Sequence, residues 1–513
     1  MRWITLACAA ATAAALLAAG CGGDDDVPAS NDPRPALVVT KASDDGTDGT
    51  LRWAIQRSNA EPGKYRIVLT PPSGGGELAI KPTSALPAIV GPARIEGPWT
   101  GTGTPTVAVD GSSWIDLSVQ SAPGITTNCP GEVAGQFGPN TRSLKNVGLQ
   151  VVDTSKVEIT GFEVRNFCTG VMLLRSGDNQ IHHMRFFRNL GAAGVLITGD
   201  DGTPAGGATV GKSLNNVLER SEFLNNSDAL DIARGSDGTI VRFNTFTVNA
   251  QGTPSSGIEV LSSNGVVFED NTIDGYATAF QLGGDRHVFN RNTLNNNAIA
   301  VQMGGTGYKF TANIIRNGRT AVIQTTGGTK LNTLSQNRIY ANGKDLDRCA
   351  PLNGQSTVPD AGVCLTKEWL TSRISIGLSG FSATPTPNDA AAACADNFAD
   401  CTAPQNTPVL AAPTTSGGFT LTGTLTTRPN EAFVVEYFAS HTSGPDGKGE
   451  GEIYLGKQDV NSGTTGVVNL SFPAGTSDPL KDGTKAVFFT ATATRVSNGQ
   501  TSEFSAPQQG TAP

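Results

Sequence analysis

A turn centred on asparagine recurs five times between Leu214 and Asn342, and this repeat limits the possible folds more than any other feature. The repeated phrases are VRFNTFTVN, VFEDNTIDG, VFNRNTLNNN, KFTANIIRNG and LSQNRIYANG, with central asparagines Asn244, Asn271, Asn292, Asn313 and Asn337. A period of about 20 to 30 residues is typical of a solenoid, whose units bury their apolar sides by stacking on each other. Asparagine recurring at one turn predicts a ladder of side-chain hydrogen bonds along the stack.

The residue types within the repeat indicate strands. A leucine-rich repeat has a similar period, but its L-x-x-L-x-L spine is missing and Val, Ile, Phe, Thr and Gly dominate. Glycine is abundant at 62 residues and aromatic residues make up only 6%, which suits short strands joined by tight turns. The sequence therefore predicts an all-β chain built on a right-handed parallel β-helix.

The stretch TLRWAIQRSNA predicts a short helix near the start of the mature fold. Leu51, Ala54, Ile55 and Ser58 would share one face, which could cover the open end of the solenoid. This stretch resembles elements that precede many bacterial β-helix proteins, including pectate-lyase-like ones. The resemblance implies a pectin lyase-like architecture and says little about chemistry.

Composition divides the chain into five predicted segments. Residues 1–20 read as a signal peptide, 21–35 as a flexible tether, and 36–343 as the β-helix with its N-terminal cap. Residues 344–405 lose the repeat and read as an irregular, cysteine-containing C-terminal cap. Residues 406–513 carry alternating strands, and their phrases YFA and TATAT…TSEFS resemble the small Ig-like β-sandwich that ends many bacterial β-helix surface proteins.

The first segment predicts export to the cell envelope. The sequence LLAAGC resembles the lipobox of bacterial lipoproteins, with Ala18 where leucine is commonest. The resemblance implies cleavage before Cys21, a lipid on its sulfur and an extracytoplasmic protein anchored to the outer membrane. Ordinary secretion is the alternative. The net charge of −8 offers no basic surface for nucleic acid.

Six further cysteines form an even set, which in an exported chain favours disulfides. Cys349–Cys364 and Cys394–Cys401 are local pairs, leaving Cys129–Cys168, although other pairings are possible. A zinc site is the rival interpretation, but the sequence has no C-x-x-C and no histidine among these cysteines.

Aligning the strands that precede the asparagine turns predicts one outward-facing column of side chains. Its members are Gln150, Met172, Leu196, Asp231, Glu259, Gln281, Gln302 and Ile323. Because parallel strands lie about 4.8 Å apart, Asp231 and Glu259 would stand side by side, flanked by two glutamines. Like charges so close raise one pKa, which would place a general acid beside a general base. The backbone spacing suits a retaining glycosidase, but splayed side chains could admit a water.

The segment NSDALD also resembles the N-T-D-G-I-D segment of polygalacturonase-type glycoside hydrolases, which implies an acid/base role for Asp228. The family's following Asp-Asp pair is replaced here by Ser256-Gly257, and its other motifs have no counterpart. The competing interpretation is that these carboxylates only cap turns or face solvent.

A pectate-lyase-like alternative would need calcium and a basic residue. Asp200, Asp201 and Asp228 could supply oxygen ligands, while Arg175 and Arg234, expected in neighbouring coils, could supply positive charge. The alternative is a polar loop and surface arginines.

Two functional hypotheses follow. In the first, this envelope lipoprotein binds and cleaves polysaccharide, as a glycoside hydrolase or lyase, with Asp231, Glu259 and Asp228 catalytic. Gln281, Gln302, Arg234 and Arg175 would then bind substrate. In the second, it is a non-catalytic adhesin or structural protein whose partner is a surface glycan. The fold alone does not choose between them.

Overall fold

The computed structural model describes residues 32–115, 146–191, 193–199, 211–249, 256–324, 331–344, 375–378, 385–388, 405–414, 418–475 and 486–510. The chain divides into two compact units, Met1–Arg34 and Pro35–Pro513, and every described strand and helix belongs to the second. No described helix is both long enough and apolar enough to cross a bilayer.

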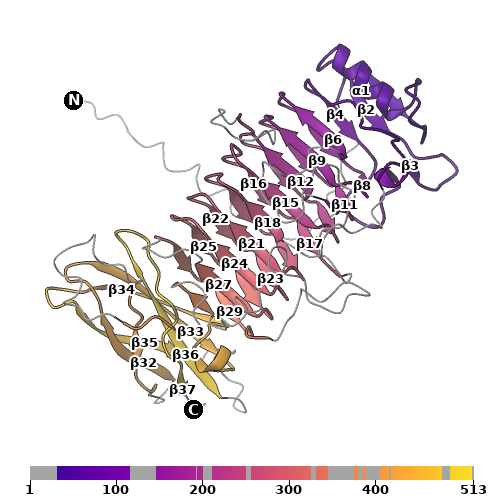
Figure 1. Cartoon of the computed structure of the whole chain (residues 1–513). Coiled ribbons are helices and arrows are strands. Elements are labelled where there is room, and N and C mark those ends of the chain that lie inside the picture. Colours follow the sequence, from indigo (N-terminus) through magenta and orange to yellow (C-terminus); the bar gives the residue numbers. More distant parts are fainter. Residues whose placement is uncertain are drawn as a thin grey trace, which may run out of the picture. The chain divides into compact units, whose positions relative to one another are not determined.

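Three parallel sheets wind into a right-handed β-helix, which confirms the predicted fold (Figure 1). Sheet A contains β1 Ala36–Val39, β2 Arg66–Leu69, β4 Arg94–Glu96, β7 Glu158–Thr160, β10 Gln180–His182, β13 Val217–Glu219, β16 Ile240–Arg242, β19 Val267–Glu269, β22 Val288–Asn290, β25 Lys309–Thr311 and β28 Thr333–Ser335. Sheet B contains β3 Leu78–Ile80, β5 Val107–Asp110, β8 Glu163–Arg165, β11 Arg185–Phe187, β14 Glu222–Leu224, β17 Thr245–Thr247, β20 Thr272–Asp274, β23 Thr293–Asn295, β26 Ile314–Arg316 and β29 Arg338–Tyr340. Sheet C contains β6 Val147–Val152, β9 Thr169–Leu174, β12 Ala193–Thr198, β15 Asp228–Ile232, β18 Ser256–Val260, β21 Thr278–Leu282, β24 Ile299–Met303, β27 Thr320–Gln324 and β30 Ile376–Gly377.

The repeated asparagines form the predicted ladder at the turn from sheet A to sheet B. The side-chain nitrogen of Asn244 donates to Asn271, that of Asn271 to Asn292, and so on through Asn313 to Asn337, at 2.9–3.1 Å. The residue before each ladder asparagine has a φ of 53–57°, which turns the chain sharply. None of those residues is β-branched, as expected for a left-handed backbone.

Aromatic rings stack along the interior of the solenoid. Phe268, Phe289 and Phe310 form one stack, with ring centroids 4.9 and 4.1 Å apart. All three are buried, and each contributes about 2–3 kcal/mol of hydrophobic stabilisation. These rings occupy equivalent positions in successive coils, so they hold the strands in register.

The N-terminal coil carries the one α-helix of the described chain, α1 Leu51–Ala60. Thr50 caps it by accepting a hydrogen bond from the Trp53 backbone N–H. Its buried face is Leu51, Ala54, Ile55 and Ser58, the four residues predicted from the sequence. Two 3-10 helices, Gly111–Ser113 and Pro445–Gly447, are the other helical elements among the described residues.

The C-terminal region contains two small antiparallel sheets, as predicted for residues 406–513. One has β31 Val409–Leu410, β32 Phe419–Thr426 and β35 Val467–Gly475; the other has β34 Ile453–Asn461, β33 Ala432–Ser440, β36 Val487–Arg495 and β37 Gln508–Gly510. Leu421 and Leu470 of the first sheet share a core with Tyr437 and Phe489 of the second. This packing is that of a small β-sandwich.

Only one cysteine, Cys168, lies among the described residues. It is fully buried and disulfide-bonded, and its partner lies outside the described residues. The predicted pairings among Cys129, Cys349, Cys364, Cys394 and Cys401 therefore stay predictions. The signal peptide and Cys21 also lie outside the described residues.

Candidate functional site

The outward column of sheet C has the register predicted from the sequence. Gln150, Met172, Leu196, Asp231, Glu259, Gln281, Gln302 and Ile323 follow one another as direct partners on adjacent parallel strands. Leu230 and Ile232, on either side of Asp231, are core residues, so the Asp231 side chain points out of the solenoid.

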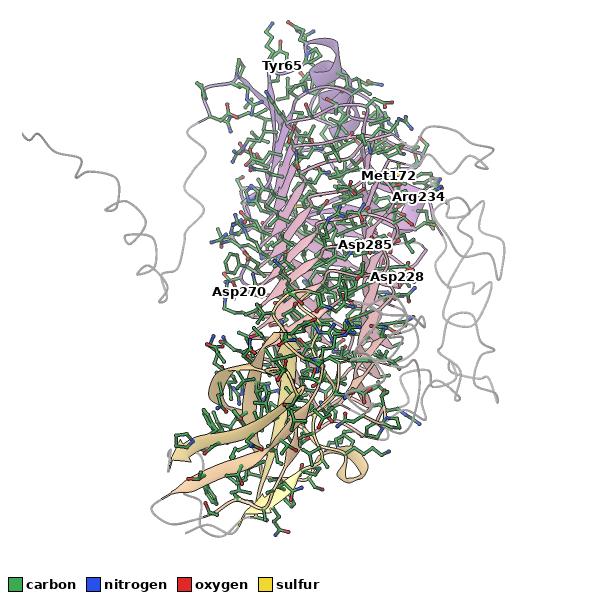
Figure 2. The ribbon with its side chains drawn as sticks, turned by 90° about the vertical axis from the view of Figure 1, so that its left-hand side faces the viewer. Tyr65, Met172, Asp228, Arg234, Asp270 and Asp285 are labelled. Atoms are coloured by element: carbon green, nitrogen blue, oxygen red, sulfur yellow. The ribbon has the colours of Figure 1, made fainter. Side chains whose placement is uncertain are left out.

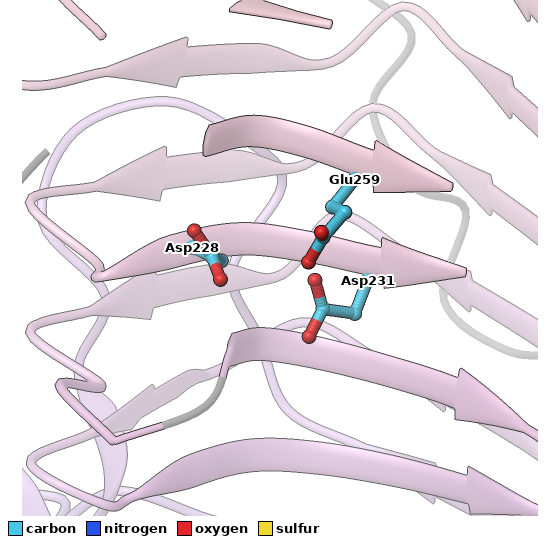
Figure 3. Close-up of side chains that lie close together, drawn as sticks. All are labelled: Asp228, Asp231 and Glu259. Atoms are coloured by element: carbon cyan, nitrogen blue, oxygen red, sulfur yellow. The ribbon is translucent and has the colours of Figure 1, made fainter. Parts of the chain in front are cut away.

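Two carboxylates of this column lie close to a third from the start of β15. Asp228 and Asp231 lie on β15, and Glu259 lies on the adjacent strand β18. Each offers an oxygen that lies within 4.8 Å of an oxygen of the other two. Figure 3 shows the Asp231 and Glu259 carboxylates pointing toward each other, with Asp228 farther along its strand. We call Asp228, Asp231 and Glu259 the acidic cluster.

The acidic cluster is buried, although the sequence predicted an outer wall. Asp228 is 6% exposed, Asp231 1% and Glu259 7%. The Asp231 and Glu259 side chains do point outward, as predicted, and their burial argues against the competing interpretation that they only face solvent. Burying carboxylates is costly unless donors, protons or cations compensate their charge, and this cost marks the cluster as a functional candidate.

Two neighbouring residues hold the cluster by hydrogen bonds. The Ser256 backbone N–H donates to Asp228 Oδ1 at 2.7 Å, and Gln281 Nε2 donates to Glu259 Oε1 at 2.7 Å. The Ser256 hydroxyl in turn donates to Gln281 Oε1 at 3.3 Å. A chain of hydrogen bonds therefore connects Asp228 to Glu259 through Ser256 and Gln281.

Two polar groups close to the cluster lack hydrogen-bond partners among the described residues. The hydroxyl of Tyr276 is fully buried, and burial raises the pKa of this phenol, with the negative charge of Asp228 adding to the rise. The Oε1 atom of Gln302, two strands from Glu259, is also buried without a donor. Such groups cost free energy unless a ligand or water pairs with them.

A group of buried apolar side chains borders the acidic cluster on its other side. Val147, Met172, Leu174, Ala193, Leu196 and Ala233 form a buried hydrophobic cluster on the outer face of sheet C. Figure 2 places Met172, Arg234 and Asp228 along one side of the solenoid and Asp270 on the other. The site thus combines carboxylates and amides with adjacent apolar side chains, as small-molecule sites commonly do.

The acidic cluster also has the donor type that a hard cation prefers, because one oxygen from each of its three carboxylates lies within 4.8 Å of the other two. Of the predicted calcium ligands, Asp228 belongs to this cluster, while Asp200 and Asp201 lie outside the described residues. The calcium prediction therefore remains a prediction.

The two arginines do not lie as predicted. They occupy equivalent positions two coils apart, and the coil of β12 lies between them. On one side of that coil the Arg175 N–H donates to the Thr198 carbonyl, and on the other the Gly199 N–H donates to the Arg234 carbonyl. They are therefore not in neighbouring coils. The Arg175 side chain forms an ion pair with Asp153 at 2.6 Å.

Ser256 and Tyr276 are not among the site residues that the sequence predicts. Ser256 is the partner of Asp228 one coil later, because Leu230 pairs with Ile258, so extending the strand alignment by two residues would have found it. Tyr276 has no comparable signal, because its phenol reaches the region of Asp228 from the turn before β21.

Comparison with known proteins places this chain among known β-helix sequences. A family described as a right-handed β-helix region matches residues 138–294. The 3-dehydroshikimate dehydratase of Acinetobacter baylyi is 32% identical over 451 residues, covering 86% of this chain and 90% of that protein.

Solved structures resemble the β-helix at lower identity. An alginate lyase from Paenibacillus sp. is 16% identical, with a TM-score of 0.34, and covers 60% of this chain and 97% of that one. A polygalacturonase from Erwinia carotovora is 9% identical, with a TM-score of 0.38, and covers 61% and 84%. The surface adhesin PfbA of Streptococcus pneumoniae is 10% identical, with a TM-score of 0.33, and covers 57% and 86%. The shared feature is the β-helix, which does not specify a substrate.

Proposed function

Because the chain belongs to the family of the Acinetobacter baylyi 3-dehydroshikimate dehydratase, we propose that it eliminates water from 3-dehydroshikimate or a closely related cyclic hydroxy-ketone acid. The observation that carries this proposal is 32% identity over 451 residues. The acidic cluster supports it, because a dehydration needs both a proton acceptor and a proton donor.

The proposed chemistry uses two carboxyl groups of the cluster. Glu259 takes a proton from a ring carbon, and its electrons form a carbon–carbon double bond as the hydroxyl on the neighbouring carbon departs. Asp231, protonated, gives its proton to that hydroxyl, which leaves as water. The hydrogen bond from Gln281 favours the charged form of Glu259, the form that a base requires. Enolisation of the remaining ketone then yields a dihydroxybenzoate.

The direct test is to incubate the full-length chain with 3-dehydroshikimate and follow substrate and dihydroxybenzoate by liquid chromatography. Asp231→Asn and Glu259→Gln should each lower kcat by about 100-fold or more, because each removes one proton-transfer group. Asp270→Asn is the matched control, since Asp270 forms an ion pair with Arg291 away from the cluster. Parallel reactions with a chelator and with added calcium test the calcium prediction.

Either of two results would contradict the proposal. One is a wild-type chain that does not convert 3-dehydroshikimate, and the other is variants of the acidic cluster that remain as active as Asp270→Asn. Melting temperatures close to that of the wild type must accompany any loss of activity, so that unfolding is not mistaken for a catalytic defect.

Cleavage of polysaccharide is the second candidate, supported by the in-register placement of Asp231 beside Glu259. The small exposed fractions of these carboxylates favour a small substrate over a polymer. A panel of plant, algal and bacterial polysaccharides, assayed for reducing ends and unsaturated uronates, separates the two. Asp231→Asn combined with Glu259→Gln should abolish any cleavage while leaving folding intact. No cleavage, together with binding on a glycan array, would favour the adhesin hypothesis.

We also propose that the protein is attached to the cell envelope through a lipid on Cys21. The support is the sequence LLAAGC after a short apolar segment. Metabolic labelling with a fatty acid should mark the wild type and not Cys21→Ser. Equal labelling of both would contradict the proposal.

A further inference from the structure

The two glutamines beside the acidic cluster are used differently. Gln281 uses both ends of its amide, since Nε2 donates to Glu259 and Oε1 accepts from the Ser256 hydroxyl. Gln302 is the direct partner of Gln281 on the next strand, and its Oε1 is buried with no hydrogen-bond partner among the described residues. Gln281 on β21 thus bonds to other side chains of the protein, whereas Gln302 on β24 keeps an acceptor that no described residue fills.

The contacts of Gln281 fix the orientation of Glu259. The amide fixes one oxygen of the carboxylate at 2.7 Å, and Ser256 fixes the amide from its other end. Ser256 is itself held by its backbone N–H on Asp228. Glu259 therefore cannot rotate without breaking the Gln281 hydrogen bond, and its carboxylate stays directed toward Asp231 (Figure 3).

We infer that Gln281 is a positioning residue for Glu259, and that Gln302 is the glutamine that accepts a hydrogen bond from a substrate hydroxyl group. The inference rests on the proposed dehydration, for which Glu259 is the base. Gln281 and Gln302, which the sequence predicted to bind substrate together, therefore have different roles.

The position of Gln302 suits a substrate contact. It lies two strands from Glu259, about 10 Å along the stack, a distance that a substituted six-membered ring and the glutamine side chain can bridge. An unpaired buried carbonyl costs free energy, and a ligand hydroxyl would remove that cost on binding. The interaction forms with the ground state and the transition state alike, so it should govern affinity more than rate.

Steady-state kinetics on 3-dehydroshikimate separate the two roles. Gln281→Met should lower kcat on the order of 100-fold with little change in KM, because the base is misplaced. Gln302→Met should raise KM roughly tenfold with kcat unchanged, because one hydrogen bond to substrate is lost. Gln150→Met is the matched control, since Gln150 belongs to the same column but is separated from Asp231 by β9 and β12.

The pH profile adds a readout that a merely structural defect would not move. Without the Gln281 donor, the charged form of Glu259 is less favoured, so the acid limb of kcat in Gln281→Met should shift to higher pH. Gln302→Met should keep the wild-type limb. A raised KM with unchanged kcat in Gln281→Met, or a lowered kcat with unchanged KM in Gln302→Met, would overturn the assignment.

Thermal unfolding tests the positioning role without any substrate. In a double-mutant cycle of Glu259→Met and Gln281→Met, the losses in melting temperature should be non-additive, because both changes remove the same hydrogen bond. Gln302→Met should not lower the melting temperature, because it removes an unpaired group. If the wild type does not convert 3-dehydroshikimate, the proposed function fails while this cycle still decides the Gln281–Glu259 contact. Additive losses would refute that contact.

Discussion

At the scale of single residues, a ladder asparagine within the stack joins three successive coils. Asn292 donates through its side chain to Asn313 Oδ1 and to the Phe268 carbonyl, each at 3.0 Å. Its Oδ1 accepts from both the backbone and the side chain of Asn271, at 3.1 and 2.9 Å. Asn292 is fully buried, so water cannot replace these partners.

Asn292→Ala should therefore lower the free energy of unfolding by about 3 kcal/mol, because it leaves several buried donors and acceptors unpaired. Asn249→Ala is the control, since Asn249 is exposed and its hydrogen-bond partner Asn225 is only half-buried. Chemical denaturation of both variants measures the difference. Equal free energies of unfolding for the two variants would show that the ladder does not stabilise the solenoid.

The sequence predicted the acidic cluster better than it predicted the surroundings of the cluster. Alternation along a strand and the spacing of the turns are properties of the backbone, so they placed Asp231 beside Glu259 correctly. Burial of these carboxylates depends on what covers the outer face of sheet C, and periodicity does not contain that information. The orientation of Gln281 likewise depends on which rotamer lets its amide meet Ser256 and Glu259 together.

At the scale of elements, charged side chains form a network across the outer face of sheet A. Arg66 pairs with Glu96, Arg94 bridges Glu96 and Glu158, and the His182 ring hydrogen-bonds to Glu158 at 2.9 Å. The hydrogen bond with His182 lowers the pKa of Glu158, against partial burial that raises it, and the charge of Arg94 lowers it further.

The lowered pKa of Glu158 makes a prediction for stability against pH. A carboxyl whose pKa falls on folding stabilises the protein above its unfolded pKa, and this contribution is lost as pH falls through the folded pKa. Glu158→Gln should therefore show a smaller loss of melting temperature than the wild type on acidification below pH 4.5, the ordinary pKa of this group. Melting curves across the acid range test this, and a wild-type acid dependence in Glu158→Gln would contradict it.

The period of the repeat located the later coils and not the earlier ones. From β13 onward the phrases are regular enough to count, whereas β4 pairs directly with β7 although Arg94 and Glu158 are 64 residues apart. A long insertion within one coil removes the periodic signal without disturbing the stack. The helix α1 was predicted because its apolar spacing is local and needs no knowledge of the rest of the chain.

At the scale of the whole Pro35–Pro513 unit, the C-terminal sheets pair with the last coil of the solenoid. The backbones of Ile339 and Gly451 exchange two hydrogen bonds, at 2.7 and 2.8 Å. Thr501 of the C-terminal region contacts β28 of sheet A. Its hydroxyl accepts a hydrogen bond from the Leu334 N–H at 2.9 Å, and its own N–H donates to the Asn332 carbonyl. These contacts occupy strand edges that would otherwise be open for pairing with another chain.

Three buried glutamates of the same region accept further N–H groups. Glu436 accepts from Gln336 at 3.0 Å, Glu450 from Ala341 at 2.9 Å, and Glu503 from the short segment at Leu378 at 2.9 Å.

Burial raises the pKa of each of these carboxyls. A raised pKa means that folding favours protonation, so this contribution to stability is largest in acid and declines as pH rises toward the folded pKa. At neutral pH these glutamates stabilise the fold through the hydrogen bonds that they accept from backbone N–H groups.

Removal of the C-terminal sheets should therefore destabilise the solenoid itself. A chain ending at residue 405 loses every partner named above for β28 and β29, so its last coil exposes unpaired N–H and C=O groups. We expect a lower melting temperature and concentration-dependent association, measured by calorimetry and by light scattering on a sizing column. A chain beginning at residue 32 is the control, because it removes most of the separate Met1–Arg34 unit and should melt like the full chain. A monomeric truncated chain with the wild-type melting temperature would show that the sandwich is an independent module whose role lies elsewhere.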